Sequence, residues 1–293
     1  MVQPVCWIDD EIRPLDAARI PVRDHGLLYG DGVFEGIRFY HGRPFRLAAH
    51  LQRLQDSARA IALPLPRAPD ELAGIVLRVV TAFGAPDGYL RLIVTRGDGP
   101  LGIDPGPCGT PRLLVMADEL NMVTAQQRSR GVSLIIAATR RLSADGLDPR
   151  IKSLNYLNSI LARLEASRAG ADEAILLNRE GRLTEGTADN LFLVRNDVLL
   201  TPPATEGALA GITRELILSL AAEQGIPARE QPLGPYDLHT AEEAFLTGTG
   251  AELIPVREVD GRRLPACPGP VHAACEAAFR EVIQRECAVP RPA

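Results

Sequence analysis

The sequence predicts an α+β protein of two domains, and three observations support this. Its 293 residues exceed the roughly 100 to 200 residues of a typical single domain. Strand-like and helix-like segments occur in each of two blocks. A polar segment with neither periodicity, residues 119–131, separates the blocks. We therefore expect a small N-terminal domain of residues 1–118, an interdomain loop of residues 119–131 and a larger domain of residues 132–293.

The N-terminal block begins as a strand meander. Residues up to about position 46 mix short apolar runs with Asp-Gly and His-Gly turn signals. Apolar residues at steps of three and four then predict a helix over Leu47–Ile61, which Pro64 and Pro66 end. A second helix is expected near residues 70–83. The runs "GYLRLIVTRG" and "PRLLVMAD" predict two buried strands.

The C-terminal block alternates strands and helices. The strand "VSLIIAATR" precedes a predicted helix that carries Lys152, with an apolar stripe of Leu154, Leu157, Leu161 and Leu164 and an end at Gly170. A hairpin turning at residues 180–181 and the strands "NLFLV", "VLLTPP" and "EAFLTGTG" follow. Further helices are expected after Gly211 and from about residue 271.

Composition excludes several classes of function. The chain is 46% hydrophobic and 24% charged, with a formal net charge of -5 and no arginine cluster suited to nucleic acid. No apolar run approaches the roughly 20 residues of a membrane helix. The first residues lack the apolar core of a secretory signal, so a cytoplasmic protein is expected. The five cysteines form no CxxC pair and the five histidines no HExxH motif, which argues against disulfides and metal sites.

Lys152 is the only lysine in the chain. The other 31 of the 32 basic residues are arginine. An arginine-biased composition leaves accidental survival of one lysine as a possible explanation. A primary amine can, however, attack a carbonyl and form an imine, whereas a guanidinium cannot lose its proton in a protein. The sequence therefore makes Lys152 a candidate nucleophile.

If the carbonyl belongs to pyridoxal phosphate, the sequence offers the other groups that such a site requires. Glu185, between two strand-like runs, can face the pyridine nitrogen. Tyr156, one predicted helical turn after Lys152, can reach the ring hydroxyl. Backbone amides and Thr213 at a helix start, the turn ending in Thr249, and the cation of Arg53 can bind the phosphate. Each of these residues also has an ordinary structural explanation, so only the whole set, taken together, supports a cofactor site.

Several motifs taken together resemble one enzyme family. They are "HGLLYGDGVFEGIRFY", "FRLAAHLQRLQDSA", "YLRLIVTRG", "IKSLNYLNSILARLEA", "EAILLNREGRLTEGTADNLF", "LAGITRE" and "EAFLTGTGAELIPV". In this order they resemble the fold-type IV pyridoxal phosphate enzymes, and most of all the branched-chain amino acid aminotransferases. The similarity covers nearly the whole chain.

The resemblance implies a fold and a set of roles. The fold is a small two-layer domain and a larger domain with a distorted β-barrel, with the cofactor between them, assembled as a homodimer or larger homo-oligomer. Lys152 binds the cofactor covalently and moves the proton at the substrate Cα. Glu185 pairs with the ring nitrogen, Tyr156 with the ring oxygen, and Leu209 packs on the ring. The implied phosphate ligands are Arg53, Gly211, Ile212, Thr213 and Thr249.

The substrate pocket is where the relatives differ. D-amino acid transaminases resemble "TRGTSPRAH" after the central strand, whereas this chain has "TRGDGPLGID". Leu101 and Ile103 replace the carboxylate-binding arginine and histidine, and an apolar wall there favours branched side chains. The resemblance further places Phe34 and Gly36 in the pocket and Tyr29 and Arg38 beside it. Tyr89 and Arg91, two apart on one strand, are expected to accept the distal carboxylate of glutamate, and Gly250 to adjoin the substrate carboxylate.

The expected reaction moves the amino group of L-leucine, L-isoleucine or L-valine to 2-oxoglutarate by a ping-pong mechanism. Ala210 and Gly250 depart from the family pattern, which weakens the assignment of carboxylate contacts there. A D-amino acid or (R)-amine transaminase and an aminodeoxychorismate lyase remain alternatives within the same fold. A pyridoxal phosphate-binding protein without catalysis is a further alternative.

Overall fold

The computed structural model describes residues 3–120 and 122–288 and divides into two compact units. The first contains the chain up to Leu120, Ile151–Asn155 and the end of the last helix from Ile283. The second contains residues 122–150 and Tyr156–Val282. Residues 1–2, 121 and 289–293 of the domain ranges expected from sequence lie outside the described residues. The segment expected as an interdomain loop contains a helix, α4 (Ala125–Arg130), whose first turn Thr124 caps.

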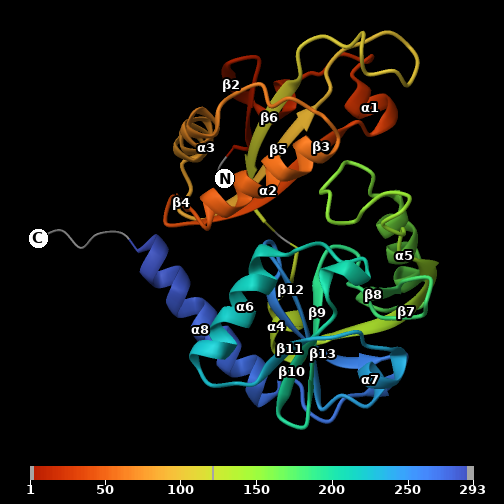
Figure 1. Cartoon of the computed structure of the whole chain (residues 1–293). Helices are drawn as coiled ribbons and strands as arrows, with labels where there is room; N and C mark the ends of the chain where they lie inside the picture. Colours follow the sequence, from red (N-terminus) through yellow and green to blue (C-terminus); the bar gives the residue numbers. More distant parts are fainter. Residues whose placement is uncertain (1–2, 121, 289–293) are drawn as a thin grey trace, which may run out of the picture. The chain divides into compact units, whose positions relative to one another are not determined.

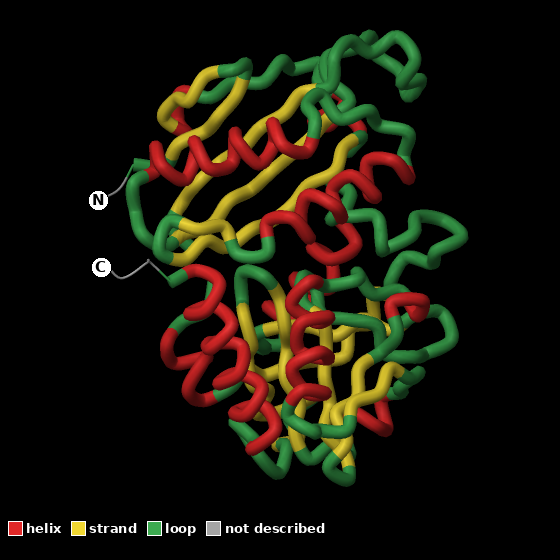
Figure 2. The backbone as a smooth tube through the Cα atoms, turned by 60° about the vertical axis from the view of Figure 1, so that its left-hand side comes forward, coloured by secondary structure: helices red, strands yellow, loops and turns green. Residues whose placement is uncertain are grey.

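The first unit is built on a six-stranded antiparallel sheet in the order β2-β1-β6-β5-β3-β4 (Figures 1 and 2). Its strands are β1 (Val5–Ile8), β2 (Glu11–Pro14), β3 (Gly32–Tyr40), β4 (Arg43–Pro44), β5 (Gly88–Thr95) and β6 (Arg112–Asp118). Its helices are α1 (His25–Tyr29), α2 (Leu47–Ala60) and α3 (Pro69–Phe83), with a 3-10 turn at Leu15–Ala17. The two helices and two strands predicted after residue 46 are confirmed.

Alternation along the strands places the core of this unit on one face of the sheet. Leu90 and Leu92 of β5 and Ile37 of β3 pack with Leu54 of α2 and Leu72 of α3 in one buried cluster. Because successive side chains of a strand point to opposite faces, the residues between them lie on the other face. That second face carries several residues predicted for the site.

The second unit is built on an eight-stranded mixed sheet in the order β11-β10-β9-β12-β13-β7-β8, with β14 paired to β13. Its strands are β7 (Val132–Arg140), β8 (Glu173–Leu177), β9 (Asn190–Arg195), β10 (Val198–Thr201), β11 (Ala228–Glu230), β12 (Glu243–Gly248), β13 (Glu252–Val259) and β14 (Arg262–Arg263). Its helices are α4, α5 (Leu157–Arg168), α6 (Ile212–Glu223), α7 (Pro235–His239) and the part of α8 (Pro270–Cys287) before Ile283, with a 3-10 turn at Ala204–Glu206. The strands are yellow in Figure 2.

This larger sheet curls around a core that its distant strands share. Ile175 of β8, Leu193 of β9, Leu200 of β10 and Val256 of β13 belong to one buried cluster, although their strands span the sheet. A flat sheet could not bring distant strands to a common core, and the register shift between Val256 and Glu258 is a bulge of the kind that bends strands. The predicted α+β class, with a distorted barrel in the larger unit, is confirmed.

The structure corrects the prediction for the helix after β7. The helix α5 begins at Leu157, so Lys152 precedes it and does not share a helical face with Tyr156, the residue before the first turn. The predicted apolar stripe is also not buried, because Leu157, Leu161 and Leu164 are 66%, 47% and 45% exposed.

A different face of α5 packs against the sheet. Its buried residues are Ser159, Ala162 and Ala166, and Ala162 and Ala166 share a cluster with residues of β7 and β8. Their short side chains let the helix lie close to the sheet. The leucines have the spacing of one helical face. This spacing does not determine whether that face or another one packs against the sheet.

Candidate active site

Strand pairing positions Lys152. The Phe34 amide donates a hydrogen bond to the Lys152 carbonyl (3.0 Å), and the Leu154 amide donates to the Gly32 carbonyl (3.0 Å). The Lys152 amide donates to the hydroxyl of Ser57 on α2 (3.1 Å). These bonds attach the segment to the edge of β3, and the Ser153 amide donates to the Ile151 carbonyl (2.8 Å) in a tight turn at Lys152, so the predicted helix does not start here. The only lysine is therefore anchored within the first unit, on both sides, by its backbone.

Five residues predicted to bind substrate lie on the face of the first sheet that α2 and α3 do not cover. Phe34, Gly36 and Arg38 alternate along β3, and Tyr89 and Arg91 alternate along β5. The strand register pairs Gly36 with Arg91 and Arg38 with Tyr89. The structure thus brings together residues that the sequence places more than 50 positions apart.

Two cations lie over one aromatic ring on this face. The guanidinium carbon of Arg91 is 4.6 Å, and Nζ of Lys152 is 4.7 Å, from the centre of the Phe34 ring. Glycine at position 36 leaves room for the Tyr89 hydroxyl, because an added Cβ would stand 1.8 Å from it and would displace the Tyr89 side chain. This face therefore combines an aromatic floor, a primary amine and positive charge that attracts carboxylates.

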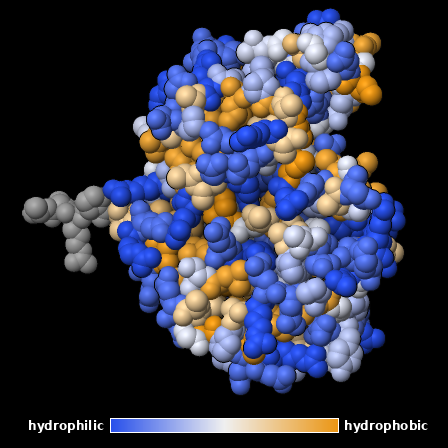
Figure 3. Space-filling model, viewed as in Figure 1, coloured by the Kyte–Doolittle hydropathy of each residue, from blue (hydrophilic) through white to orange (hydrophobic). Residues whose placement is uncertain are grey.

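The remaining predicted pocket residues of the first unit form a separate group on the surface. The Tyr29 hydroxyl accepts a hydrogen bond from the Gly102 amide (2.9 Å) in the loop of residues 96–111 between β5 and β6. Leu101 and Ile103 of this loop are 79% and 86% exposed. Hydrophobic residues colour the outer edge of the loop at the upper right of Figure 3. Within one chain these two side chains form no buried wall.

Arg53 belongs to a buried charged network that sequence reasoning did not find. Its Nε and Nη2 donate to the two carboxylate oxygens of Glu35 (2.7 and 2.8 Å), and Nδ1 of His50 lies 2.7 Å from Glu35 Oε2. Glu35 and His50 are completely buried. Burial raises the pKa of Glu35, but hydrogen bonds from Arg53 and His50 outweigh it and lower the pKa to about 2. The ionised carboxylate only accepts hydrogen bonds, so Nδ1 of His50 carries a proton.

A signal for this network was present in the sequence. His50 and Arg53 stand three residues apart on α2, hence on one face, and Glu35 interrupts the apolar positions of β3 that face that helix. A charged residue at a core position predicts a buried partner of opposite charge. The network holds the Arg53 guanidinium in one orientation.

In the second unit, Glu185 is surrounded by hydrogen-bond donors. The Leu209 amide donates to Oε2 (2.9 Å), the Asn190 side chain donates to the same oxygen (3.3 Å), and Nη2 of Arg141 lies 2.5 Å from Oε1. Asn190 also donates to the Leu209 carbonyl (2.9 Å). Arg141 and Asn190 were not predicted, because neither lies near Glu185 in a recognisable local pattern. Glu185 is thus held as a buried, oriented carboxylate beside Leu209.

The start of α6 provides backbone donors for an anion. Gly211 precedes the first helical residue, Ile212, and no described side chain caps this end. A Cβ at position 211 would stand 1.9 Å from Oδ1 of Asn190, so the close approach requires glycine. Thr213 in the first turn is buried. Uncapped amides and the helix dipole suit a phosphate group, so these residues fit the cofactor expected from sequence.

A second turn of the same unit lies near this helix start. Thr247 of β12 pairs with Asn190 of β9, and the partly buried Thr249 and Gly250 follow directly. A cavity of about 260 Å³ adjoins this turn and is lined by residues that include Met122, Asp189, Leu246 and Ala251. Met122 belongs to the segment 119–131, so part of that segment lines a cavity.

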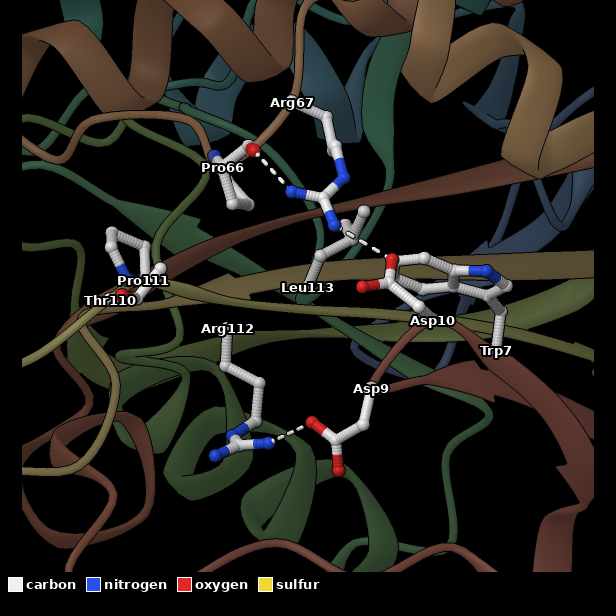
Figure 4. Close-up of a pocket in the computed structure, with 9 residues that line it drawn as sticks. All are labelled: Trp7, Asp9, Asp10, Pro66, Arg67, Thr110, Pro111, Arg112 and Leu113. Carbon is white, nitrogen blue, oxygen red and sulfur yellow. Dashed lines mark hydrogen bonds and ion pairs between the residues drawn. The ribbon is translucent and has the colours of Figure 1, made fainter.

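Another cavity, of about 200 Å³, lies at the turn between β1 and β2 and contains none of the predicted site residues (Figure 4). Its charged residues form ion pairs: Arg67 donates to Asp10 (2.7 Å) and Arg112 to Asp9 (2.5 Å), and Nε of Arg112 also lies 3.5 Å from the buried carboxylate of Asp24. Asp9 and Asp10 are largely exposed, so their pairs contribute little stability.

Two other kinds of site are absent from residues 3–120 and 122–288. No group of three or more metal-binding side chains is close enough to hold an ion. No helix in these ranges has the length and apolar character needed to cross a membrane.

Comparison with known proteins agrees with these arrangements. A model of the family described as amino-transferase class IV matches residues 32–259. A protein of Methanocaldococcus jannaschii described as a putative branched-chain-amino-acid aminotransferase is 48% identical over 245 residues, 84% of each chain. The structure is similar to that of the Escherichia coli branched-chain amino acid aminotransferase, with a TM-score of 0.93, 34% identity and coverage of 99% of this chain and 97% of that one. It is also similar to the Thermobaculum terrenum branched-chain amino acid aminotransferase in its PLP form, with a TM-score of 0.89, 30% identity and coverage of 98% and 96%.

Proposed function

This chain belongs to the class IV aminotransferases, and from that premise we propose that it transfers the amino group of L-leucine, L-isoleucine or L-valine to 2-oxoglutarate. Relatives that are 34 to 48% identical over most of their length are branched-chain aminotransferases by name. The observation that carries the proposal is the position of the only amine of a lysine side chain, 4.7 Å from the Phe34 ring and beside the cation of Arg91.

The proposal assigns the chemical step to Lys152. Pyridoxal phosphate supplies, when bound, an aldehyde that reacts with amines and a ring that takes up electrons. With the cofactor bound, the Lys152 amine would hold it covalently and, once a substrate amine has taken its place, would take the proton from the substrate Cα as a general base. The backbone hydrogen bonds of Lys152 to β3 and α2 fix the base of its side chain, so the amine can reach only a limited region around the Phe34 ring.

The other assignments concern binding of the cofactor. We propose that Glu185 pairs with the pyridine nitrogen, that Tyr156 pairs with the ring oxygen and that Leu209 packs on one face of the ring. The phosphate is assigned to the amides of residues 211–213, to the hydroxyls of Thr213 and Thr249, and to Arg53. The uncapped start of α6 and the donors that surround the Glu185 carboxylate support these roles.

A half-reaction assay tests the proposed substrates. Purified protein loaded with pyridoxal phosphate should change its visible spectrum on addition of L-leucine, because the amino group passes to the cofactor. Addition of 2-oxoglutarate should then restore the first spectrum. A response to D-alanine without a response to L-leucine would instead indicate the D-specific reaction, and release of pyruvate from aminodeoxychorismate would indicate the lyase.

Arg91→Met should separate the two substrates. We propose that Arg91 and Tyr89 accept the distal carboxylate of glutamate and 2-oxoglutarate, which leucine lacks. Loss of the guanidinium removes a charged hydrogen bond, so KM for 2-oxoglutarate should rise by about 10- to 100-fold. The rate of the leucine half-reaction should change far less. Equal losses in both half-reactions, measured by stopped-flow absorbance, would contradict the assignment.

We also propose that the protein is at least a homodimer. Leu157, Ile160, Leu161 and Leu164 form an exposed stripe along α5 at helical spacing, and a stripe of this kind is typical of a surface that a partner covers. Leu161→Glu combined with Leu164→Glu should weaken association at least ~10-fold, since it places two charges in the apolar contact. Sedimentation equilibrium measures the association constant.

The control for this experiment is Leu77→Glu, which changes a leucine of α3 that is 48% exposed. Leu77 is outside the stripe, so its variant should associate like the unmodified protein. An unmodified protein that stays monomeric at micromolar concentration would contradict the dimer.

A further inference from the structure

Arg141 makes a short contact to the carboxylate of Glu185. Its Nη2 lies 2.5 Å from Oε1, and the side chains of Arg141 and Glu185 are only 14% and 7% exposed. Solvent screens a buried ion pair far less than a surface pair. The carboxylate assigned to the ring nitrogen therefore has a fixed positive charge on its other side.

The guanidinium of Arg141 is itself held from several directions. Nε donates to the Gly207 carbonyl (3.1 Å) and Nη1 donates to the hydroxyl of Ser159 on α5 (3.2 Å). The Arg141 amide donates to the Leu177 carbonyl at the end of β8 (2.8 Å). All three of these partners belong to the second unit.

These contacts close a ring of hydrogen bonds. Arg141 binds both the Gly207 carbonyl and Glu185, and the Leu209 amide, two residues after Gly207, donates to the other oxygen of the same carboxylate. A planar guanidinium with several donors in one plane can serve the carbonyl, the hydroxyl and the carboxylate together. The ammonium of a lysine has a different geometry and would not reproduce all three contacts.

We propose that Arg141 is a positioning residue that keeps Glu185 ionised and oriented, so that the proton shared by Glu185 and the pyridine nitrogen of bound cofactor stays on the nitrogen. This inference rests on the proposed role of Glu185. A carboxylate and a ring nitrogen that share one proton form either an ion pair or a neutral pair. The positive charge of Arg141 lies against the carboxylate and stabilises its anion, which favours the ion pair.

The test uses holoenzyme reconstituted with pyridoxal phosphate carrying 15N at the ring nitrogen. The 15N NMR shift reports directly whether that nitrogen is protonated, without any measurement of activity. In the unmodified protein the signal should be that of a protonated nitrogen. In Arg141→Gln it should move towards the unprotonated value, with kcat lowered by about 10- to 100-fold and KM for leucine little changed.

Arg182→Gln is the matched control. Arg182 forms its ion pair with Glu206 (3.0 Å), in the same unit, rather than with Glu185. Its removal takes away the same charge and one arginine–glutamate pair, so a general loss of charge or stability would appear in both variants. The 15N shift should be unchanged in Arg182→Gln.

Failure of the proposed function and failure of the proposed role of Arg141 give different results in this experiment. An unmodified protein that binds no cofactor would contradict the proposed function, whereas an unchanged 15N shift in Arg141→Gln would overturn the role of Arg141 alone. If Arg141→Gln does not fold, Arg141→Lys gives the second measurement. It keeps the charge but not the planar fork, so the 15N signal should lie between the two extremes. A fully protonated signal in Arg141→Lys, with kcat unaltered, would show that the charge alone is sufficient and would overturn the positioning role of the planar guanidinium.

Discussion

Replacing Lys152 by alanine should abolish transamination of L-leucine while the protein stays folded. The variant loses both the covalent bond to the cofactor and the base at the substrate Cα, so activity should fall by more than about 1,000-fold. The fold should persist because the backbone of Lys152, and not its amine, bonds to β3 and to Ser57. The contact of the amine with the Phe34 ring is worth only about 0.5 to 1 kcal/mol.

Lys152→Arg is the more demanding control. It preserves the positive charge and the contact with the ring, but a guanidinium cannot lose its proton and cannot form the bond to an aldehyde. It should therefore be as inactive as the alanine variant and should lack the visible absorption of covalently bound cofactor. Thermal unfolding followed by circular dichroism checks the fold of both variants. Leucine transamination retained by either one would refute the assignment of Lys152.

Glu35→Gln should reduce the free energy of unfolding at neutral pH by about 3 kcal/mol. Glu35 neutralises Arg53 beneath the sheet, and its removal leaves a buried cation without its partner. The pKa of Glu35 is lowered from 4.5 to about 2, and each pKa unit corresponds to ~1.4 kcal/mol. Urea unfolding at pH 7, followed by circular dichroism, measures the difference.

The same network predicts how stability depends on pH. Because the pKa of Glu35 is lower in the folded protein, its contribution is complete above about 4.5 and is lost as pH falls towards about 2. Burial also lowers the pKa of His50, against the opposing hydrogen bond with Glu35, so the unfolded chain takes up that proton first as pH falls. Both groups therefore make the protein less stable in acid.

Glu11→Gln is the control for this experiment. Glu11 pairs with Arg13 at 2.7 Å on the surface, where both side chains are exposed. The variant removes the same charge but should change stability little, since solvent screens the pair. Equal losses in Glu11→Gln and Glu35→Gln would show that net charge, and not the buried network, sets the effect.

The local patterns of the sequence predicted the elements that depend on local spacing. Apolar residues at steps of three and four marked α2 and α3, and alternation along β5 placed Tyr89 and Arg91 on one face. The same reasoning failed around Lys152, where a helical pattern gave way to hydrogen bonds with β3. Edge pairing with a strand more than 100 residues away has no local signature.

By itself, the sequence determined the chemistry available to this protein. One amine among 32 basic side chains, an acid between two strands, and a Gly-Ile-Thr helix start made pyridoxal phosphate the expected cofactor and Lys152 the residue proposed to bind it. These are properties of individual side chains and of short spacings along the chain, so they can be read from the sequence without knowledge of the fold.

Only the tertiary structure decided which groups surround these residues. It placed Arg141 against Glu185 and Glu35 against Arg53, and it left the leucine stripe of α5 on the surface. The pairs are 44 and 18 residues apart, and the partners meet because separate strands and helices pack around each of two cores. Long-range packing selects such partners by geometry and by the cost of burying an unpaired charge, and neither is encoded in local periodicity.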